Sequence, residues 1–213
     1  MFFDLPTLTL FVGAVLALSF TPGPDMLMCI TAGTRAGPRG AVAAGIGLWV
    51  GLTAHSFAAA FGLAALLAAS PHAFEAIRWV GAAYLVWIGI QALRKPAQKT
   101  RPPAVNDAKG AMPLMPFFRQ ALITNLLNPK VILFFLAFLP QFADPAQGAV
   151  WAQILTLGLL FSFIGIGINI AIGATGGMIS ARLSAYKGTA RWLNRLVAAV
   201  FFSLAARLVL AER

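Results

Sequence analysis

The sequence predicts an all-α integral membrane protein with six transmembrane helices, built as two inverted three-helix repeats whose first and fourth helices are broken. Three observations support this prediction. The chain is 60% apolar and 10% charged, whereas a soluble domain is about 25% charged. Uncharged runs cover residues 5–24, 40–74 and 145–181. Related residues also recur about 110 residues apart, and such internal repeats are typical of transporters.

The uncharged runs place six helices, because an ionised side chain at the centre of a membrane helix costs about 2.5–3.5 kcal/mol. We expect helices near 5–34, 40–69, 76–94, 117–139, 150–177 and 191–210. The first apolar segment lacks the basic stretch of a secretory signal, so we expect it to stay in the mature protein. At 213 residues, six such helices leave no room for a separate soluble domain, and residues 1–213 should form one transmembrane domain.

Lys and Arg residues predict the orientation, because they accumulate in cytoplasmic loops. They fall in the first, third and fifth loops, at Arg35 and Arg39, within 94–109, and within 182–195. Both termini should therefore be extracytoplasmic, and residues 95–116 should form a cytoplasmic linker. The same rule accounts for the net charge of +10. Since no aromatic-studded basic groove accompanies these residues, the expected partner is the lipid bilayer and not a nucleic acid.

Corresponding residues in the two halves define the repeat. Pro24 matches Pro129 at an offset of 105 residues, and each is followed by a charged residue. Offsets of 113–114 relate Gly51 to Gly165, His55 to Asn169, and Trp79 to Trp192. Repeat one then covers about 5–94 and repeat two about 117–210. Three spans per half is an odd number, so the halves insert with opposite topology, as in many secondary transporters.

Prolines break the first and fourth helices at corresponding places. Pro22, Gly23 and Pro24 interrupt the apolar run of the first helix, and Pro129 interrupts that of the fourth helix. Each proline lacks a backbone donor and clashes with the preceding helical turn. Backbone that is broken at membrane depth has to be buried or line a polar cavity, so paired breaks predict a substrate-binding site.

Asp25 and Lys130 are the main candidate site residues. An amino acid is a zwitterion, so its site needs acceptors for the ammonium and donors for the carboxylate. Asp25 is suited to the ammonium or to a coupling proton, and Lys130 to the carboxylate. Two structural alternatives stay open: Asp25 caps the resumed helix, or the two residues form an ion pair that serves only packing.

Four uncharged polar residues complete the candidate set. His55 lies on an otherwise apolar helix, where it is either a proton carrier or a neutral packing residue. Asn125, Asn128 and Asn169 either bind substrate or hydrogen bond between helices, and the two asparagines beside Pro129 are the stronger candidates.

Several other classes of function are disfavoured. The single cysteine, Cys29, excludes an intramolecular disulfide relay, and Cys29, His55 and His72 form no recognisable metal-ligand cluster. No catalytic or cofactor motif is present, so an enzyme is not expected. Cation or heavy-metal efflux remains the alternative function. The small-residue pairs Gly47/Gly51 and Gly173/Gly177 suit close helix packing, either within the chain or in a homodimer.

Three segments resemble the lysine exporter family, especially its homoserine/threonine exporter branch. They are residues 20–25 (FTPGPD), 124–130 (TNLLNPK) and 135–142 (FLAFLPQF), and the resemblance covers essentially the whole chain. It implies an exporter of amino acids or related metabolites in the bacterial cytoplasmic (inner) membrane, coupled to the proton motive force. Many relatives have an acidic residue shortly before the histidine of the second helix, where this chain has Leu52.

Overall fold

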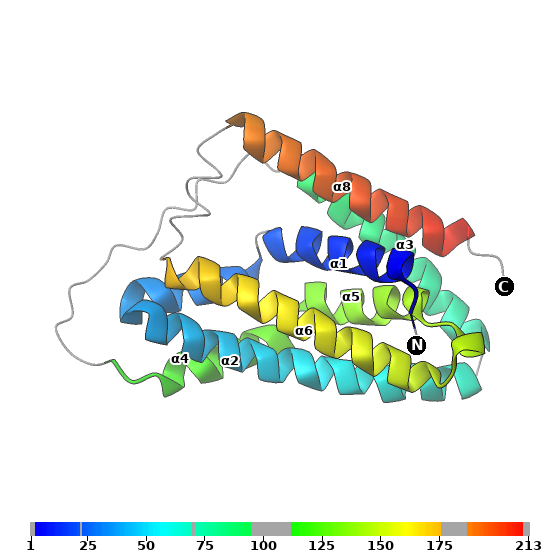
Figure 1. Cartoon of the computed structure of the whole chain (residues 1–213), viewed down its shortest axis with the longest axis horizontal. Helices are drawn as coiled ribbons and strands as arrows, with labels where there is room; N and C mark the ends of the chain where they lie inside the picture. The colour runs from blue at the N-terminus through cyan, green and yellow to red at the C-terminus, as the bar shows by residue number, and fades with distance from the viewer. Residues whose placement is uncertain (1–2, 22, 70, 95–111, 176–186, 211–213) are drawn as a thin grey trace.

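The computed structural model describes residues 3–21, 23–69, 71–94, 112–175 and 187–210 (Figure 1). Every regular element in these ranges is a helix, and none of the described residues forms a strand. The elements are α1 (Leu5–Phe20), α2 (Pro24–Ala69), α3 (Pro71–Arg94), α4 (Met115–Leu126), α5 (Pro129–Phe138), the 3₁₀ turns η1 (Leu139–Phe142) and η2 (Pro145–Gln147), α6 (Val150–Ala174) and α8 (Lys187–Leu210).

Helices that correspond in the predicted repeats pack against each other. α2 lies along α6, and α3 lies along α8. The short helices α1 and α5 run between these two pairs (Figure 1), where α1 contacts α6 and α8 while α5 contacts α2 and α3. Two short apolar segments of the chain are thereby placed in the middle of the bundle.

Both predicted breaks are present. The first helix stops at Phe20 and resumes at Pro24, and the fourth stops at Leu126 and resumes at Pro129. A proline opens each resumed helix, at a position where its missing N–H is not needed.

Three predicted boundaries differ from those observed. The loop expected around residues 35–39 is a kink within α2, where Gly37 has φ 64° and is followed by Pro38. Glycine accepts this positive φ at little cost, and proline then restarts the helix. α3 begins at Pro71 and not near 76, and α8 begins at Lys187 and not near 191. α3 therefore includes residues 71–75 and α8 includes residues 187–190 ahead of the predicted starts.

Two of the described helices are long and apolar enough to cross a membrane, Pro24–Leu63 and Val150–Ala174. The pair Met115–Leu126 and Pro129–Phe142, bent by 50° at its break, makes a third if it forms one span. α1 is apolar, but its 16 residues extend only about 24 Å, less than the bilayer core of about 30 Å. The helical composition fits a membrane protein, while the six-span arrangement stays a prediction.

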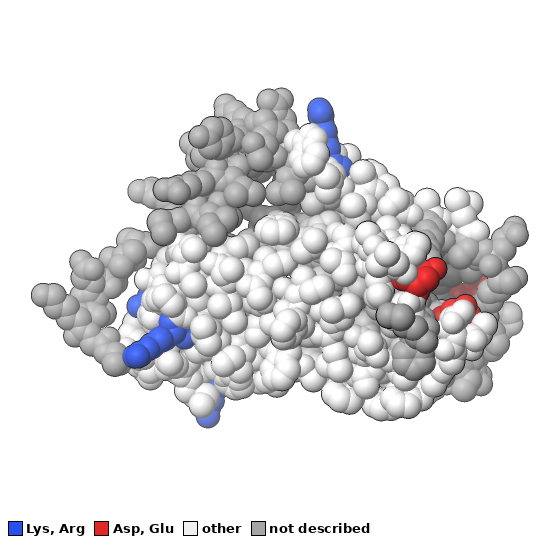
Figure 2. Space-filling view, viewed as in Figure 1, with Lys and Arg blue, Asp and Glu red and all other residues white. Residues whose placement is uncertain are grey.

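The outer surface is suited to lipid. Large apolar side chains face outward along the helices, including Phe163 in α6 (75% exposed) and Val80 in α3 (59% exposed). Figure 2 shows a mostly uncharged surface, with visible acidic side chains at the end where α1 begins and α8 ends, and several basic ones at the opposite end. Water would disfavour so much exposed apolar area, whereas lipid tails accept it.

Glycines allow the closest helix contacts. A Cβ at Gly33 would collide with the carbonyl of Gly173, and a Cβ at Gly173 would lie 2.6 Å from the carbonyl oxygen of Cys29. Gly47 faces the backbone of Phe118 in α4 in the same way. These small-residue faces are therefore occupied within the chain and give no support to the predicted homodimer. Gly177 lies outside the described residues.

The Gly33 contact predicts a pair of stability measurements. Gly33→Ala should lower the free energy of unfolding by about 1–3 kcal/mol, because the added methyl group forces α2 away from α6. Gly13→Ala is the control, since Gly13 is exposed in α1 and a Cβ there would meet no described atom within 4 Å outside its own helical turn. This substitution should be neutral or stabilising. Thermal unfolding in detergent measures both, and equal stability of the two variants would contradict the tight crossing.

Candidate functional site

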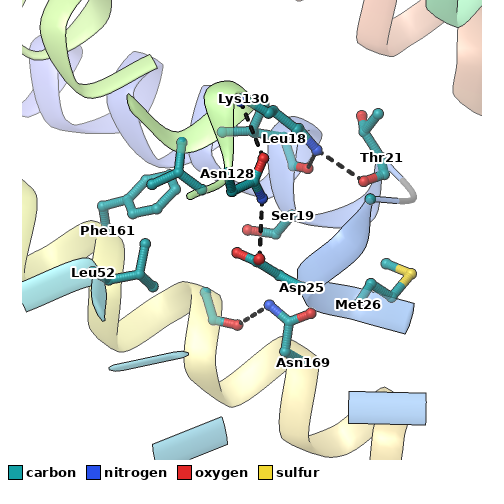
Figure 3. Close-up of a pocket in the computed structure, with 13 residues that line it drawn as sticks. Leu18, Ser19, Thr21, Asp25, Met26, Leu52, Asn128, Lys130, Phe161 and Asn169 are labelled. Atoms are coloured by element: carbon teal, nitrogen blue, oxygen red, sulfur yellow. Dashed lines mark hydrogen bonds between the residues drawn. The ribbon is translucent and has the colours of Figure 1, made fainter. Parts of the chain in front are cut away.

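The two helix breaks meet in the middle of the bundle. Residues around the first break, between α1 and α2, contact residues around the second, between α4 and α5 (Figure 3). Both breaks arise from proline, and each exposes backbone groups that a continuous helix would satisfy. Side chains from the second break supply partners for groups at the first.

Two asparagine amides from the second break hold Asp25. Asn125 Nδ2 donates to Asp25 Oδ2 over 2.6 Å, and Asn128 Nδ2 donates to Asp25 Oδ1 over 3.0 Å. Asp25 also lies in the first turn of α2, where the helix dipole favours a negative charge. Its carboxylate therefore has a donor on each oxygen. Gly51 makes room for this arrangement, because a Cβ there would lie 2.5 Å from Asn125 Oδ1.

Lys130 reaches across to the C-terminal end of α1. Its Nζ donates to the carbonyl oxygens of Leu18 over 3.1 Å and Thr21 over 3.0 Å (Figure 3). Carbonyls at a helix C-terminus lack intrahelical partners and carry the negative end of the dipole, so they suit a cation. Lys130 is the second residue of α5, where its charge opposes the dipole, but its long side chain places the ammonium at the C-terminal end of α1, which favours a cation.

Asn128 connects the acidic and basic groups. While its Nδ2 donates to Asp25, its Oδ1 accepts from the backbone N–H of Lys130 over 3.1 Å and so caps α5. The ordinary capping contribution is about 1 kcal/mol. One buried side chain thus fixes both the start of α5 and the position of the carboxylate.

His55 contacts the same network through Asn125 and not through Asp25 itself. Its Nε2 lies 3.2 Å from the backbone carbonyl oxygen of Asn125. A carbonyl oxygen only accepts, so His55 donates from Nε2. Its ring also contacts Phe135, with centroids 5.9 Å apart. The structure therefore places His55 against the asparagine that binds Asp25.

Asn169 approaches the site from α6. Its Nδ2 donates to the carbonyl oxygen of Gly165 over 2.8 Å, while its buried Oδ1 has no hydrogen-bond partner among the described residues. The residue is only 9% exposed. A buried acceptor without a donor is costly and is characteristic of a site that receives a ligand or water.

A small cavity of about 40 Å³ lies among these groups. This volume holds a few water molecules but not a whole amino acid. The residues that line it are Leu18, Ser19, Thr21 and Gly23 from the first break and its approach, Asp25, Met26 and Leu52 from α2, Asn128, Lys130 and Val131 from the second break, and Phe161, Gly165 and Asn169 from α6.

All six predicted polar site residues thus lie in or beside one network, together with Gly23, Pro24 and Pro129, while Pro22 lies outside the described residues. The sequence pattern did not identify the Leu18 and Thr21 carbonyls or the lining residues Ser19 and Phe161. The prolines signalled that carbonyls would be freed, but not which side chain would bind them.

Known proteins are similar to this chain over nearly its whole length. The family model described as LysE type translocator matches residues 16–212. The homoserine/homoserine lactone efflux protein of Salmonella typhimurium is 34% identical over 196 residues, which cover 92% of each chain. The leucine efflux protein of Enterobacter sp. (strain 638) is 30% identical over 200 residues, covering 94% of this chain and 93% of that protein.

A membrane protein of Vibrio cholerae is 41% identical over 141 residues, which cover 66% of each chain. No solved structure matches the chain. The family match runs from residue 16 to residue 212 and so includes both breaks, the last residues of α1, and all of α2, α4 and α5. The described site therefore lies within the matched region.

Proposed function

Because the chain belongs to the LysE type translocator family, we propose that it is a secondary exporter of amino acids or related small metabolites, driven by the proton motive force. The protein is a translocator and not an enzyme. We place it in the bacterial inner membrane, as its matches to bacterial membrane and efflux proteins favour.

The observation that carries the proposal is the position of Asp25 and Lys130 beside the small cavity where the two broken helices meet. Ionisable side chains are expensive within a membrane and are usually retained there for transport. Both groups are held by neutral polar partners, which a substrate of matching charge can replace without leaving either group in an apolar environment.

Asp25 is the proposed acceptor for the substrate ammonium. Ser19 and Asn169 line the same cavity, and Asn169 Oδ1 has no hydrogen-bond partner among the described residues. With Asp25, three side chains could therefore offer oxygen atoms to an ammonium group with three N–H donors. Lys130 is the proposed partner of the substrate carboxylate. Its Nζ would then donate to the carboxylate in place of the Leu18 and Thr21 carbonyl oxygens. The resulting site complements a zwitterion.

Substrate binding requires the cavity to expand, because about 40 Å³ is too small for an amino acid. We propose six spans in two inverted halves that move against each other around the breaks. The pairing of α2 with α6 and of α3 with α8 supports this arrangement, as does the position of the repeat-related residues His55 and Asn169 beside the same site.

Transport in proteoliposomes tests the function. An acidic lumen should drive uptake of labelled leucine or homoserine several-fold above uptake without a gradient, because export exchanges substrate for protons. A protonophore should abolish the difference. Uptake of Cd²⁺ or Zn²⁺ with no response to any amino acid would instead support cation efflux, the alternative function.

Asp25→Asn should reduce substrate flux by about 10- to 100-fold, since it removes a charged hydrogen-bond acceptor worth roughly 1.5–3 kcal/mol. Insertion should persist, because Asn125 Oδ1 has no hydrogen-bond partner in the described part of the chain and the amide can turn this oxygen toward the new N–H₂ group. Asp144→Asn is the matched control, as Asp144 is exposed and its carboxylate accepts from the nearby backbone N–H of Ala146. Flux is normalised to inserted protein, and full activity of Asp25→Asn combined with Lys130→Met would contradict the functional role.

Cysteine labelling tests the proposed orientation in a Cys29→Ala background. A membrane-impermeant thiol reagent applied to intact cells should label Ala211→Cys but not Lys99→Cys, because basic loops stay in the cytoplasm. Permeabilised cells provide the control, in which both positions should react. External labelling of position 99 with protection of position 211 would reverse the orientation.

A further inference from the structure

The cavity beside Asp25 has a polar side and an apolar side. In Figure 3, Asp25, Asn128, Lys130 and Thr21 lie toward one side, and Leu52 and Phe161 toward the other. The polar side provides groups for the charged ends of an amino acid. The apolar side is then left for the substrate side chain.

Gly165 borders this cavity at the junction of the two sides. A Cβ at this position would lie 3.9 Å from Ser19 Oγ and 4.0 Å from Leu52 Cδ1, and these are its nearest neighbours outside its own helical turn. Both distances are ordinary van der Waals separations. The missing Cβ therefore leaves free volume in the cavity and is not required for close helix packing, in contrast to Gly33 and Gly173.

The backbone of Gly165 has a separate role, because its carbonyl oxygen accepts from Asn169 Nδ2 over 2.8 Å. This bond orients Asn169 and leaves its Oδ1 available. A substitution at position 165 keeps the carbonyl, so it changes the cavity volume while retaining the position of Asn169.

We propose that Gly165 determines the largest substrate side chain that the exporter accepts. This inference rests on the proposed function, namely that an amino acid binds in this cavity with its ammonium at Asp25. A methyl group is about as large as a water molecule, and the cavity holds only a few waters. Its addition at position 165 removes space that a branched side chain needs, but leaves enough for a small one.

Gly165→Ala should therefore shift selectivity toward small substrates. One methylene group in an apolar pocket changes discrimination by about 10- to 200-fold, so the ratio of leucine flux to alanine flux should fall by about tenfold or more. Proteoliposomes with an acidic lumen and labelled alanine, homoserine or leucine provide the measurement. The amount of inserted protein normalises each rate.

Gly167→Ala is the matched control. Gly167 lies two residues along the same helix and is exposed, and its potential Cβ would meet no described atom within 4 Å outside its own helical turn. Both substitutions raise helix propensity equally, so only the position of the methyl group differs. The control should keep the wild-type flux ratio.

Leu52→Ala in the Gly165→Ala background supplies a rescue test, because Leu52 is one of the two side chains nearest to the added methyl. The enlarged cavity should restore at least part of the leucine to alanine ratio. An unchanged ratio in Gly165→Ala, or equal loss of flux for all three substrates without rescue, would overturn the role of Gly165. Absence of amino-acid flux in the wild-type protein would instead reject the proposed function.

Discussion

The need to satisfy polar groups at the two helix breaks is the constraint on which the rest of the structure depends. Proline frees backbone carbonyls at the end of α1, and Lys130 from the other half binds them. The lysine and its neighbour Asn128 in turn need Asp25 nearby for charge and hydrogen-bond balance. The hydrocarbon core of the bilayer offers no bulk water to take over these contacts. Each half therefore supplies what the other lacks, and neither break is expected to be stable alone.

This constraint also accounts for the glycines along α2 and α6. Short side chains such as those of Asp25 and Asn125 reach each other only if the supporting helices approach closely, and Gly51 leaves the space that Asn125 occupies. The Gly33–Gly173 crossing holds α2 against α6 at one end of the same pair. Apolar attraction between helices is weak in a membrane, so such close backbone contacts contribute much of the packing energy.

The sequence was sufficient to predict the helical class, both breaks and the residues around them, because proline, charge and uncharged length act locally. It was insufficient for the start of α3, which lies at Pro71 within a predicted loop, and for the kink at Gly37, where a positive φ lets α2 run across another predicted loop. The hydrogen-bond partners of Lys130 could not be predicted from the sequence either. Its long side chain could bind Asp25, a substrate or carbonyls, and it donates to the Leu18 and Thr21 carbonyls because α1 ends beside the start of α5.

The kink at Gly37 separates residues 24–36 from the rest of α2, and the helix break before Pro24 separates them from α1. Gly33, near the kink, packs against the backbone of Gly173. Asp25 is eight residues from Gly33, about 12 Å along the helix axis. With Gly33 as the pivot, a tilt of about 10° moves the carboxylate by about 2 Å, enough to break its hydrogen bonds to Asn125 and Asn128. The tight backbone contact at Gly33 therefore lies where a small rotation of residues 24–36 about it would move the Asp25 carboxylate at the other end of the segment.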